Sequence, residues 1–220
     1  MNELWSGSAE RGPLVFAPHG LDAAARGRPA AFLDRDGTLN EAVLDPASGR
    51  SESPLRVEDV RLLADAAVAA VSLADAGYAL VCVSNQPAAA KGKVTVAELL
   101  AIHERVIGLL ADHGAHIEAS LLCLHHPEGV VAELSGPCRC RKPAPGMLLD
   151  AATTLELDLR RSWMLGDTDG DVAAGHAAGC RTALIEYPPS AHKRSGDTRP
   201  DLCAADLGDA AAKLLASRAR

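Results

Sequence analysis

The chain has few aromatic residues and no long apolar run. Two Trp, two Tyr and two Phe are its only aromatic residues, so Ala, Leu and Val must fill the core of the folded protein. No apolar run approaches the roughly 20 residues that a membrane-spanning helix needs, and residues 1–28 lack the charged-then-apolar pattern of a secretory signal. We therefore expect a cytoplasmic protein with no membrane partner.

The chain also lacks a basic surplus. Its 22 Lys and Arg residues face 29 Asp and Glu residues, which gives a formal net charge of −7. Nucleic acids and anionic membranes attract proteins through a positive surface, so this balance argues against both as partners. An anionic small molecule remains compatible with the sequence. The cationic residues in or near the loops discussed below are Arg35, Lys91, Lys93, Arg139, Arg141 and Lys142.

Composition and length predict one folded domain with an N-terminal extension. The 220 residues are 48% hydrophobic and 23% charged, which is ordinary for a globular chain that can bury a sizeable core. Residues 1–28 carry Gly, Pro and Ala with little periodicity. We expect this segment to be loosely packed or to wrap over the body, and residues 29–220 to form the domain.

Short apolar runs alternate with helical patterns along the domain. We expect strands at residues 30–33, 78–83, 117–123, 163–165 and 182–185, and helices at residues 59–76, 95–113, 145–155, 171–178 and 206–217. Thr95 with Glu98 predicts a capping box at one helix start. The alternation predicts right-handed crossovers and a parallel sheet covered by helices on both faces, with an active site beyond the carboxyl ends of the strands.

Polar residues follow three of these strands at that edge. Asp34 and Asp36 come directly after the first strand, Ser84 follows the second and Asp167 follows the fourth. Two carboxylates on adjoining backbone can supply a nucleophile and an acid/base partner, although Asp-x-Asp-Gly-Thr alone is also compatible with a simple polar turn. A hydroxyl and free backbone N–H groups around Ser84 suit phosphate oxygens.

Two further segments add charge to this set. Lys142, just before a proline-started helix, could bring a fixed positive charge to a phosphate. Asp167, Asp169 and Asp171 suit oxygen ligation of Mg²⁺, although Asp169 or Asp171 could instead cap the following helix. An EF-hand is excluded, because a count from Asp167 places glycine at position four rather than six.

A cluster of Cys and His between residues 123 and 142 predicts a structural zinc loop. Cys123, His125, Cys138 and Cys140 offer three thiolates and one imidazole, a closed four-ligand set. The adjacent His126 is an alternative ligand to His125. A disulfide among these cysteines is the competing interpretation, which a cytoplasmic setting disfavours.

The chain carries, in this order, Asp34-x-Asp36-Gly37-Thr38, Ser84, Lys142 and Gly166-Asp167-x-x-x-Asp171. These four motifs resemble those of the haloacid dehalogenase (HAD) superfamily of phosphotransferases, and the resemblance covers residues 30–185. The resemblance implies a single Rossmann-like α/β domain with helices on both faces of a parallel sheet and no large cap domain. It also implies a Mg²⁺-dependent phosphatase that acts on a phosphate monoester through an aspartyl-phosphate intermediate.

The same resemblance implies a role for each motif residue. Asp34 would attack phosphorus, and Asp36 would protonate the leaving alkoxide and then take a proton from water. The carboxylates of Asp34 and Asp167 and the backbone carbonyl of Asp36 would hold Mg²⁺. The other motif residues are Ser84 and Lys142, which would hold the phosphoryl oxygens, and Asp171, which would orient the metal shell or Lys142.

The cysteine motif narrows the resemblance to a small capless branch that acts on heptose 1,7-bisphosphate or histidinol phosphate. The long interval between His125 and Cys138 is closer to the heptose enzymes and favours His125 as the zinc ligand. This implies a monomer that removes the 7-phosphate of D-glycero-D-manno-heptose 1,7-bisphosphate. The residues expected to face this phosphorylated sugar are Arg35, Asn85, Gln86 and Arg141.

Some residues differ from those typical of this branch. The differences concern the groups that would recognise the substrate rather than those that carry out the reaction. Pro87-Ala88-Ala89-Ala90 replaces a typical Ser-Gly-Ile-Ala, and Thr168 takes the place of a frequent Lys. Histidinol phosphate or another phosphorylated metabolite is therefore the alternative substrate, although Arg141 is unsuited to an amine. A catalytically silent, zinc-stabilised binding protein is a further alternative, and it would be expected to lack one of the motif residues.

Overall fold

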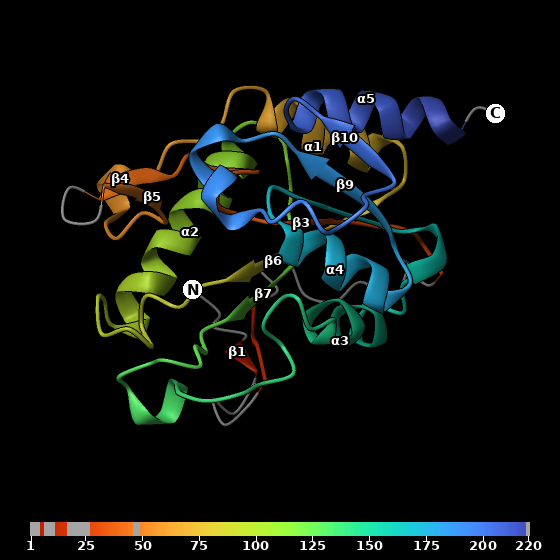
Figure 1. Ribbon diagram of the computed structural model, residues 1–220. Helices are drawn as coiled ribbons and strands as arrows, with labels where there is room; N and C mark the ends of the chain where they lie inside the picture. Colours follow the sequence, from red (N-terminus) through yellow and green to blue (C-terminus); the bar gives the residue numbers. More distant parts are fainter. Residues whose placement is uncertain (1–4, 7–11, 17–26, 46–48, 219–220) are drawn as a thin grey trace.

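A computed structural model describes residues 5–6, 12–16, 27–45 and 49–218 of the protein (Figure 1). One sheet of eight strands forms its centre, in the order β1-β2-β7-β6-β3-β8-β9-β10. The strands from β7 to β10 in this order run parallel, and β1 and β2 extend one edge in antiparallel fashion. Their bounds are β1 Trp5–Ser6, β2 Leu14–Phe16, β3 Ala30–Leu33, β6 Ala79–Asn85, β7 Ala119–Cys123, β8 Trp163–Gly166, β9 Arg181–Ile185 and β10 Leu202–Ala204.

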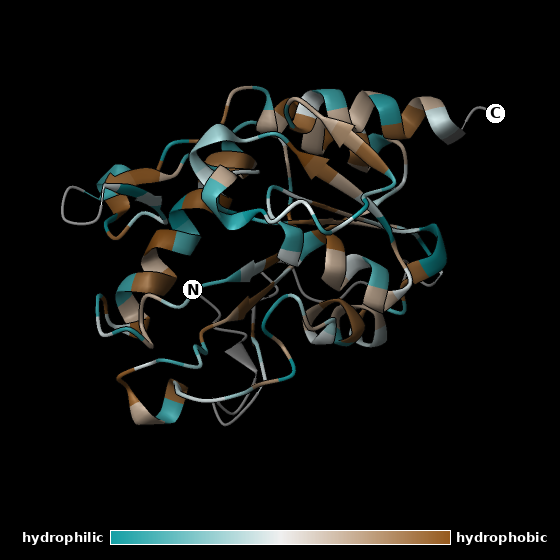
Figure 2. Cartoon of the chain, viewed as in Figure 1, coloured by the Kyte–Doolittle hydropathy of each residue, from teal (hydrophilic) through white to brown (hydrophobic). Residues whose placement is uncertain are grey.

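Helices cover both faces of this sheet, as the alternating pattern predicts. They are α1 Ala66–Asp75, α2 Val96–Asp112, α3 Gly146–Thr154, α4 Asp169–Ala178 and α5 Leu207–Arg218. Successive side chains of β3 point to opposite faces. Ala31 and Leu33 join the apolar core under α1, α2 and α5, whereas Ala30 and Phe32 join the core under α3 and α4. Apolar residues accordingly dominate the central strands (Figure 2).

The predicted α/β architecture is confirmed, and one helix start was wrong. We expected a helix from residue 59, but α1 begins at Ala66. The intervening chain is held in extended form, because Glu41 donates its amide to the Arg61 carbonyl at 2.8 Å and Leu63 donates to the Leu39 carbonyl at 3.0 Å. The capping box is confirmed, since Thr95 accepts from the Glu98 amide at 3.2 Å.

Several short elements were not predicted. Strands β4 (Val43–Asp45) and β5 (Arg50–Glu52) form a separate antiparallel hairpin, β10 forms the edge beside β9, and the 3₁₀ helix η5 spans Pro188–Lys193. Within the N-terminal segment, β2 pairs with β7 and so widens the sheet. The rest of the expected extension, apart from residues 5–6, 12–13 and 27–28, lies outside the described residues. Among the described residues, no helix is both long and apolar enough to cross a membrane.

Candidate active site

The site lies where the central strands β3, β6 and β8 end. Asp34 directly follows β3, Ser84 is the second-last residue of β6, and Asp167 directly follows β8. The Asp34 amide donates to the Leu165 carbonyl at 2.9 Å, which fixes the start of the loop against β8. Gly37 has φ +89°, and a Cβ there would collide with the Asp167 carboxylate. A glycine is therefore required where the loop after β3 passes Asp167.

Lys142 is the positive centre of this site. Its Nζ lies 2.8 Å from Asp34 Oδ1 and 2.6 Å from Asp171 Oδ1, and it donates to the Val83 carbonyl at 2.7 Å. Ser84 Oγ donates to Asp34 Oδ1 at 2.9 Å. Burial alone would lower the pKa of Lys142, but the Asp171 and Asp34 carboxylates hold that pKa above its ordinary value. The side chain is therefore a fixed cation beside the predicted nucleophile.

Asn85 holds the backbone that carries this lysine. Asn85 Nδ2 donates to the Lys142 carbonyl at 3.0 Å, and the Lys142 amide donates to Asn85 Oδ1 at 3.0 Å. We expected Asn85 to bind substrate. The structure instead uses both ends of its amide to position Lys142, although Asn85 also lines the pocket.

Asp171 combines the two roles that the sequence left open. Its Oδ2 accepts from the Thr168 amide at 3.0 Å and from Thr168 Oγ1 at 2.6 Å, which caps the start of α4. Its Oδ1 pairs with Lys142. Asp171 thus fixes both the helix start and the position of the cation.

Three carboxylates form a cluster that fits a divalent cation. Asp34, Asp167 and Asp171 each place an oxygen within 4.8 Å of the others. Both carboxylate oxygens of Asp167 are buried without a hydrogen-bond partner among the described residues. Burial and repulsion from Asp34 and Asp171 raise the pKa of Asp167 to about 8, and burial also raises the pKa of Asp34. Hard, oxygen-preferring Mg²⁺ suits such acceptors, and Asp34 and Asp167 are the residues that would hold it.

Asp36 is surrounded by hydrogen-bond donors. Arg35 donates from Nε at 3.2 Å and from a terminal nitrogen at 3.0 Å. Asn40 donates at 2.9 Å, Gln86 at 2.6 Å and Ser53 at 2.7 Å. Burial alone would raise the pKa of Asp36, but the charge of Arg35 and the hydrogen bonds lower it below its ordinary value. In this arrangement Asp36 is a carboxylate.

Two residues expected to bind substrate are placed elsewhere. The Arg35 side chain is fully buried behind Asp36 and donates to Gln86 Oε1 at 2.7 Å. Gln86 is buried as well and contacts Ser84 Oγ at 3.0 Å. Neither residue lines the pocket. The structure therefore does not bring Arg35 and Gln86 to the pocket as we expected: their side chains hydrogen-bond to Asp36 and Ser84.

The predicted zinc ligands come together away from the carboxylates. Cys140 Sγ lies 3.2 Å from Cys123 Sγ, 3.5 Å from Cys138 Sγ and 3.5 Å from His125 Nδ1. Such separations and donor types suit tetrahedral zinc, and the four residues form one candidate metal group. The hydrogen bond with Cys140 lowers the pKa of Cys123 to about 5. His126 accepts from the Glu128 amide instead, so His125 is the histidine of the cluster.

The zinc loop is packed against the walls of the active site. Arg141 donates to the His125 carbonyl at 3.2 Å. The Val130 amide donates to the Ala90 carbonyl at 2.7 Å, and Leu134 packs with Ala90 in a small apolar cluster. The cysteine cluster thus fixes Arg141 and supports the loop that follows β6.

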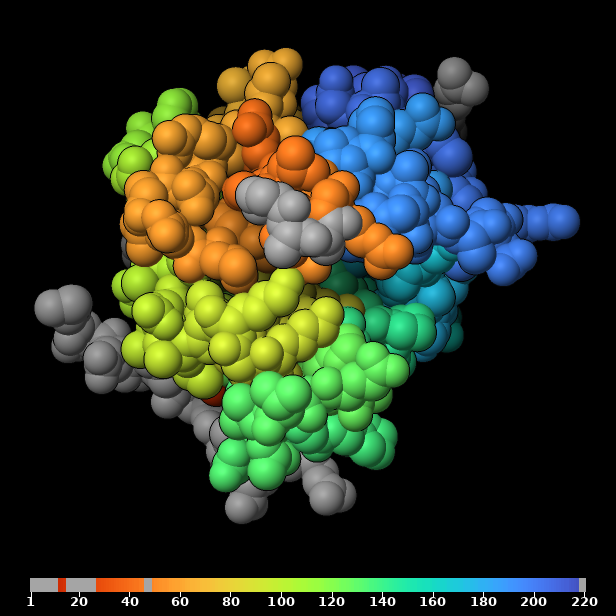
Figure 3. Space-filling view, turned by 60° about the vertical axis from the view of Figure 1, so that its left-hand side comes forward, coloured from red at the N-terminus to blue at the C-terminus, as the bar shows by residue number. Residues whose placement is uncertain are grey.

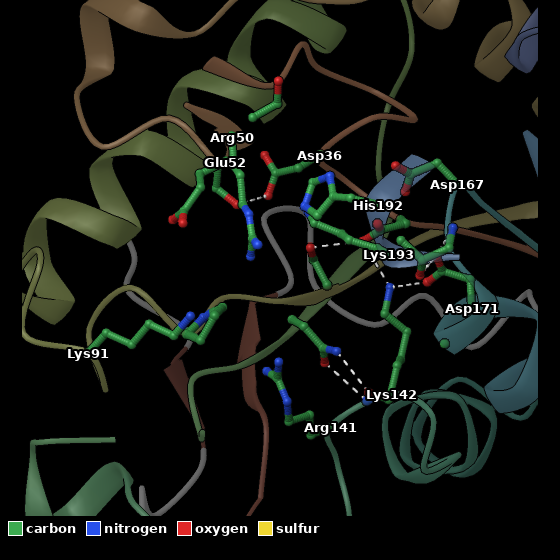
Figure 4. Close-up of a pocket in the computed structure, with 18 residues that line it drawn as sticks. Asp36, Arg50, Glu52, Lys91, Arg141, Lys142, Asp167, Asp171, His192 and Lys193 are labelled. Carbon is green, nitrogen blue, oxygen red and sulfur yellow. Dashed lines mark hydrogen bonds and ion pairs between the residues drawn. The ribbon is translucent and has the colours of Figure 1, made fainter. Parts of the chain in front are cut away.

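A cavity of about 450 Å³ opens above the carboxylates. The predicted residues that line it are Asp34, Asp36, Ser84, Asn85, Arg141, Lys142, Asp167 and Asp171. Sequence reasoning missed the contributions of β5, of the residue that follows it and of η5, which are Arg50, Ser51, Glu52, Ser53, His192 and Lys193. Figure 3 shows the segment around the hairpin (orange) between the chain around residue 90 (yellow-green) and that around residue 190 (blue). Figure 4 shows Arg50, Lys91 and Arg141 on the side away from Asp167 and Asp171.

Buried carboxylates, a paired lysine and a hydroxyl at the carboxyl edge of a parallel sheet define a phosphoryl-transfer site. Comparisons with known proteins agree. The HAD-hydrolase-like family model matches residues 139–210. The D-glycero-beta-D-manno-heptose-1,7-bisphosphate 7-phosphatase of Yersinia pestis is 35% identical over 82% of this chain and 92% of its own length. The enzyme of the same name from Rhodopseudomonas palustris is 38% identical over 72% of this chain and 84% of its own.

A solved structure extends the likeness to three dimensions. The D,D-heptose 1,7-bisphosphate phosphatase of B. bronchiseptica, complexed with magnesium and phosphate, superimposes with a TM-score of 0.73 at 28% identity. The match covers 86% of this chain and 99% of that one. The chain belongs to the HAD family of phosphatases, which use Mg²⁺.

Proposed function

We propose that this protein is a Mg²⁺-dependent phosphomonoesterase that removes the 7-phosphate of D-glycero-D-manno-heptose 1,7-bisphosphate and leaves the 1-phosphate in place. The observation that carries this proposal is one pocket with two differently charged sides. Asp34, Lys142 and the carboxylates lie on one side, and Arg50, Lys91 and Arg141 lie on the other (Figure 4). The relatives of that name at 35% and 38% identity support the same substrate.

The residues fit a two-step transfer. Asp34 attacks phosphorus while the bond to the 7-oxygen breaks, and Asp36 gives that oxygen a proton. Water then attacks the phosphorus of the aspartyl-phosphate, the bond to Asp34 breaks, and Asp36 takes the proton from the water. Lys142 and Ser84, which already contact Asp34 Oδ1 at 2.8 and 2.9 Å, hold the phosphoryl oxygens. Mg²⁺ supplies positive charge to the developing transition state.

The second phosphate of the substrate suits the opposite side of the pocket. Arg50, Lys91 and Arg141 bring three positive charges there, and Arg is well suited to phosphate oxygens. Glu52 is the acidic residue on that side, and Lys93 Nζ lies 2.7 Å from its carboxylate. A dianionic group is therefore favoured over a cationic one. This balance disfavours histidinol phosphate, whose amine would need an acidic partner.

We further propose that the enzyme is a cytoplasmic monomer. We also propose that it has no nucleic-acid partner, in keeping with its net charge of −7. It includes a single phosphatase domain over residues 29–220, with residues 1–28 as an N-terminal extension. In this account zinc on Cys123, His125, Cys138 and Cys140 is structural, because all four positions of a tetrahedral ion would be filled by protein.

Steady-state kinetics with Mg²⁺ test this assignment. The substrates are both anomers of heptose 1,7-bisphosphate, histidinol phosphate and 4-nitrophenyl phosphate. We expect kcat/KM to be at least about 100-fold higher for one heptose anomer than for the other substrates, which is about 2.7 kcal/mol of transition-state discrimination. Turnover of the aryl phosphate with no preference for a heptose would overturn the substrate and keep the reaction type.

A further inference from the structure

The short hairpin β4–β5 reaches the residue proposed as acid and base. Ser53, directly after β5, donates from Oγ to Asp36 Oδ2 at 2.7 Å. The other partners of Asp36 are Arg35 and Asn40 from its own loop and Gln86, which directly follows β6. Figure 4 shows Asp36 beside the hairpin residues Arg50 and Glu52. The hairpin that lines the substrate pocket therefore also touches the proton-transfer residue.

The four side chains that bond Asp36 differ in chemistry. The guanidinium of Arg35 and the amide nitrogens of Asn40 and Gln86 can only donate hydrogen bonds. The hydroxyl of Ser53 can donate or accept, because its hydrogen rotates about the C–O bond. Among the partners that the described chain provides, Ser53 alone can reverse the direction of its hydrogen bond by rotating one O–H bond; Asn40 and Gln86 would have to turn over the whole amide.

This difference matters because Asp36 has two forms in the proposed reaction. Oδ2 accepts from Arg35, Gln86 and Ser53 at 3.0, 2.6 and 2.7 Å, which suits a carboxylate. When Oδ2 carries the proton destined for the leaving oxygen, it has less capacity to accept. One donor must then turn away or accept instead, since an opposed donor would be left unpaired at a cost.

We propose that Ser53 is a positioning residue for Asp36, which holds both of its forms by reversing its hydroxyl. It donates to the carboxylate and accepts from the carboxylic acid until the leaving oxygen takes the proton. The proposal rests on the proposed acid/base role of Asp36 but not on the identity of the sugar. It assigns to the hairpin a part in proton transfer as well as in substrate contact.

The hairpin is anchored in a way that allows this role. Lys93 Nζ pairs with Glu52 at 2.7 Å and lies 4.0 Å from Asp45 Oδ2, so both strands are tied to the segment ahead of α2. Arg50 lines the pocket three residues before Ser53. A substrate group bound by Arg50 would therefore contact the same short segment, residues 50–53, that positions Asp36.

Leaving groups of different basicity separate this role from a general structural one. A sugar or alkyl phosphate expels a strongly basic alkoxide that needs the proton of Asp36, whereas 4-nitrophenyl phosphate expels a stable phenolate that does not. We would compare kcat/KM, which reports the transfer to Asp34 and not the later hydrolysis shared by all substrates, for an alkyl phosphate and for 4-nitrophenyl phosphate. The proteins are the wild type, Ser53→Ala, Ser53→Thr and Ser51→Ala. Ser51 is the matched control, because it lies on β5 two residues before Ser53 and also lines the pocket, but is not among the side chains that bond Asp36.

We expect Ser53→Ala to lower kcat/KM for the alkyl phosphate by roughly 10- to 100-fold, part of the 10²- to 10⁴-fold that general acids supply. The kcat/KM for 4-nitrophenyl phosphate should change by less than about threefold, because its first step does not need the proton. Ser53→Thr, which keeps the hydroxyl, should restore the alkyl-to-aryl ratio, and Ser51→Ala should not alter it. Thermal unfolding of each variant confirms that it is folded.

An equal loss of kcat/KM for both substrates, or no loss for either, would overturn the role of Ser53. So would a threonine variant that behaves like alanine. Heptose 1,7-bisphosphate and glycerol phosphate are both used as alkyl substrates. Failure of the wild type on the heptose alone would refute the proposed substrate, while the glycerol phosphate to aryl comparison would still decide the role of Ser53.

Discussion

Replacement of Lys142 by Met would leave a buried group of carboxylates without its cation. The Lys142 side chain is 3% exposed and lies within 2.8 Å of both Asp34 and Asp171. Removal of one partner from a buried ion pair costs about 3–5 kcal/mol, because the remaining charge is uncompensated. Met has a similar length and leaves little cavity. The loss in the free energy of unfolding should therefore report the charge rather than the packing.

For a domain of this size, about 2–4 °C in Tm corresponds to 1 kcal/mol, so we expect Tm to fall by roughly 6–20 °C in the absence of Mg²⁺. Saturating Mg²⁺ should restore part of this loss, since a bound cation stabilises the folded state and replaces some of the missing charge. Activity should fall below detection, because Lys142 also faces the transferred phosphate in the proposed reaction.

Urea unfolding of Lys142→Met with and without Mg²⁺ is the assay. Lys91→Met is the matched control, because Lys91 lines the same pocket but is exposed. Its unfolding free energy should change by less than about 0.5 kcal/mol. A loss below about 1 kcal/mol for Lys142→Met, or no response to Mg²⁺, would refute the idea that a cation is needed to hold these carboxylates together.

Three further predictions follow from other parts of the molecule. Because the folded-state pKa of Asp167 is raised to about 8 from 3.8, the Mg²⁺-free protein binds more protons folded than unfolded, so its stability should fall as pH rises from about 4 to about 8. Urea titrations should show that fall, and Asp167→Asn should flatten it; stability that rises over this range would contradict the raised pKa. Cys140→Ser should lower zinc content well below one per chain by atomic absorption and lower Tm, and full zinc occupancy would exclude the cluster as the metal site. Thr95→Ala removes the cap of α2 and should cost about 1 kcal/mol in urea unfolding, whereas no change would show that the cap is dispensable.

The meeting of Asp34, Ser84 and Asp167 could be predicted because each follows a strand of one parallel sheet, whose carboxyl ends share an edge. Lys142 could be assigned only through the motif order, since no local pattern shows that a lysine 58 residues after Ser84 returns to the same point. The zinc ligands were predictable for a different reason. Cys and His side chains at close spacing have few other uses in one loop.

The directions of side chains after the first strand could not be predicted. The amides of Leu39 and Asn40 both donate to the Arg35 carbonyl, at 2.8 and 3.0 Å, and this tight turn sends the Arg35 side chain inward beneath Asp36. The sequence pattern contains no signal for that turn beyond Gly37. A charged residue beside a catalytic motif is more often expected at the surface, which explains why the burial of Arg35 was not predicted.

The hairpin was missed because its strands are too short to show a pattern. Residues 43–45 and 50–52 are half-exposed or exposed and alternate weakly, so neither period nor composition marks them as strands. Their effect on the site comes from long-range contacts. Ser53 reaches Asp36 across 17 positions of the sequence, and Glu52 reaches Lys93 across 41.

The most direct test of the account follows hydrolysis of heptose 1,7-bisphosphate by ³¹P NMR for the wild type and for Asp34→Asn. The wild type with Mg²⁺ should release inorganic phosphate from position 7 and leave the signal of the 1-phosphate intact. Asp34→Asn should be folded, as judged by its Tm, and should release no phosphate above background. Release of the 1-phosphate, or turnover that survives in Asp34→Asn, would contradict the central claim.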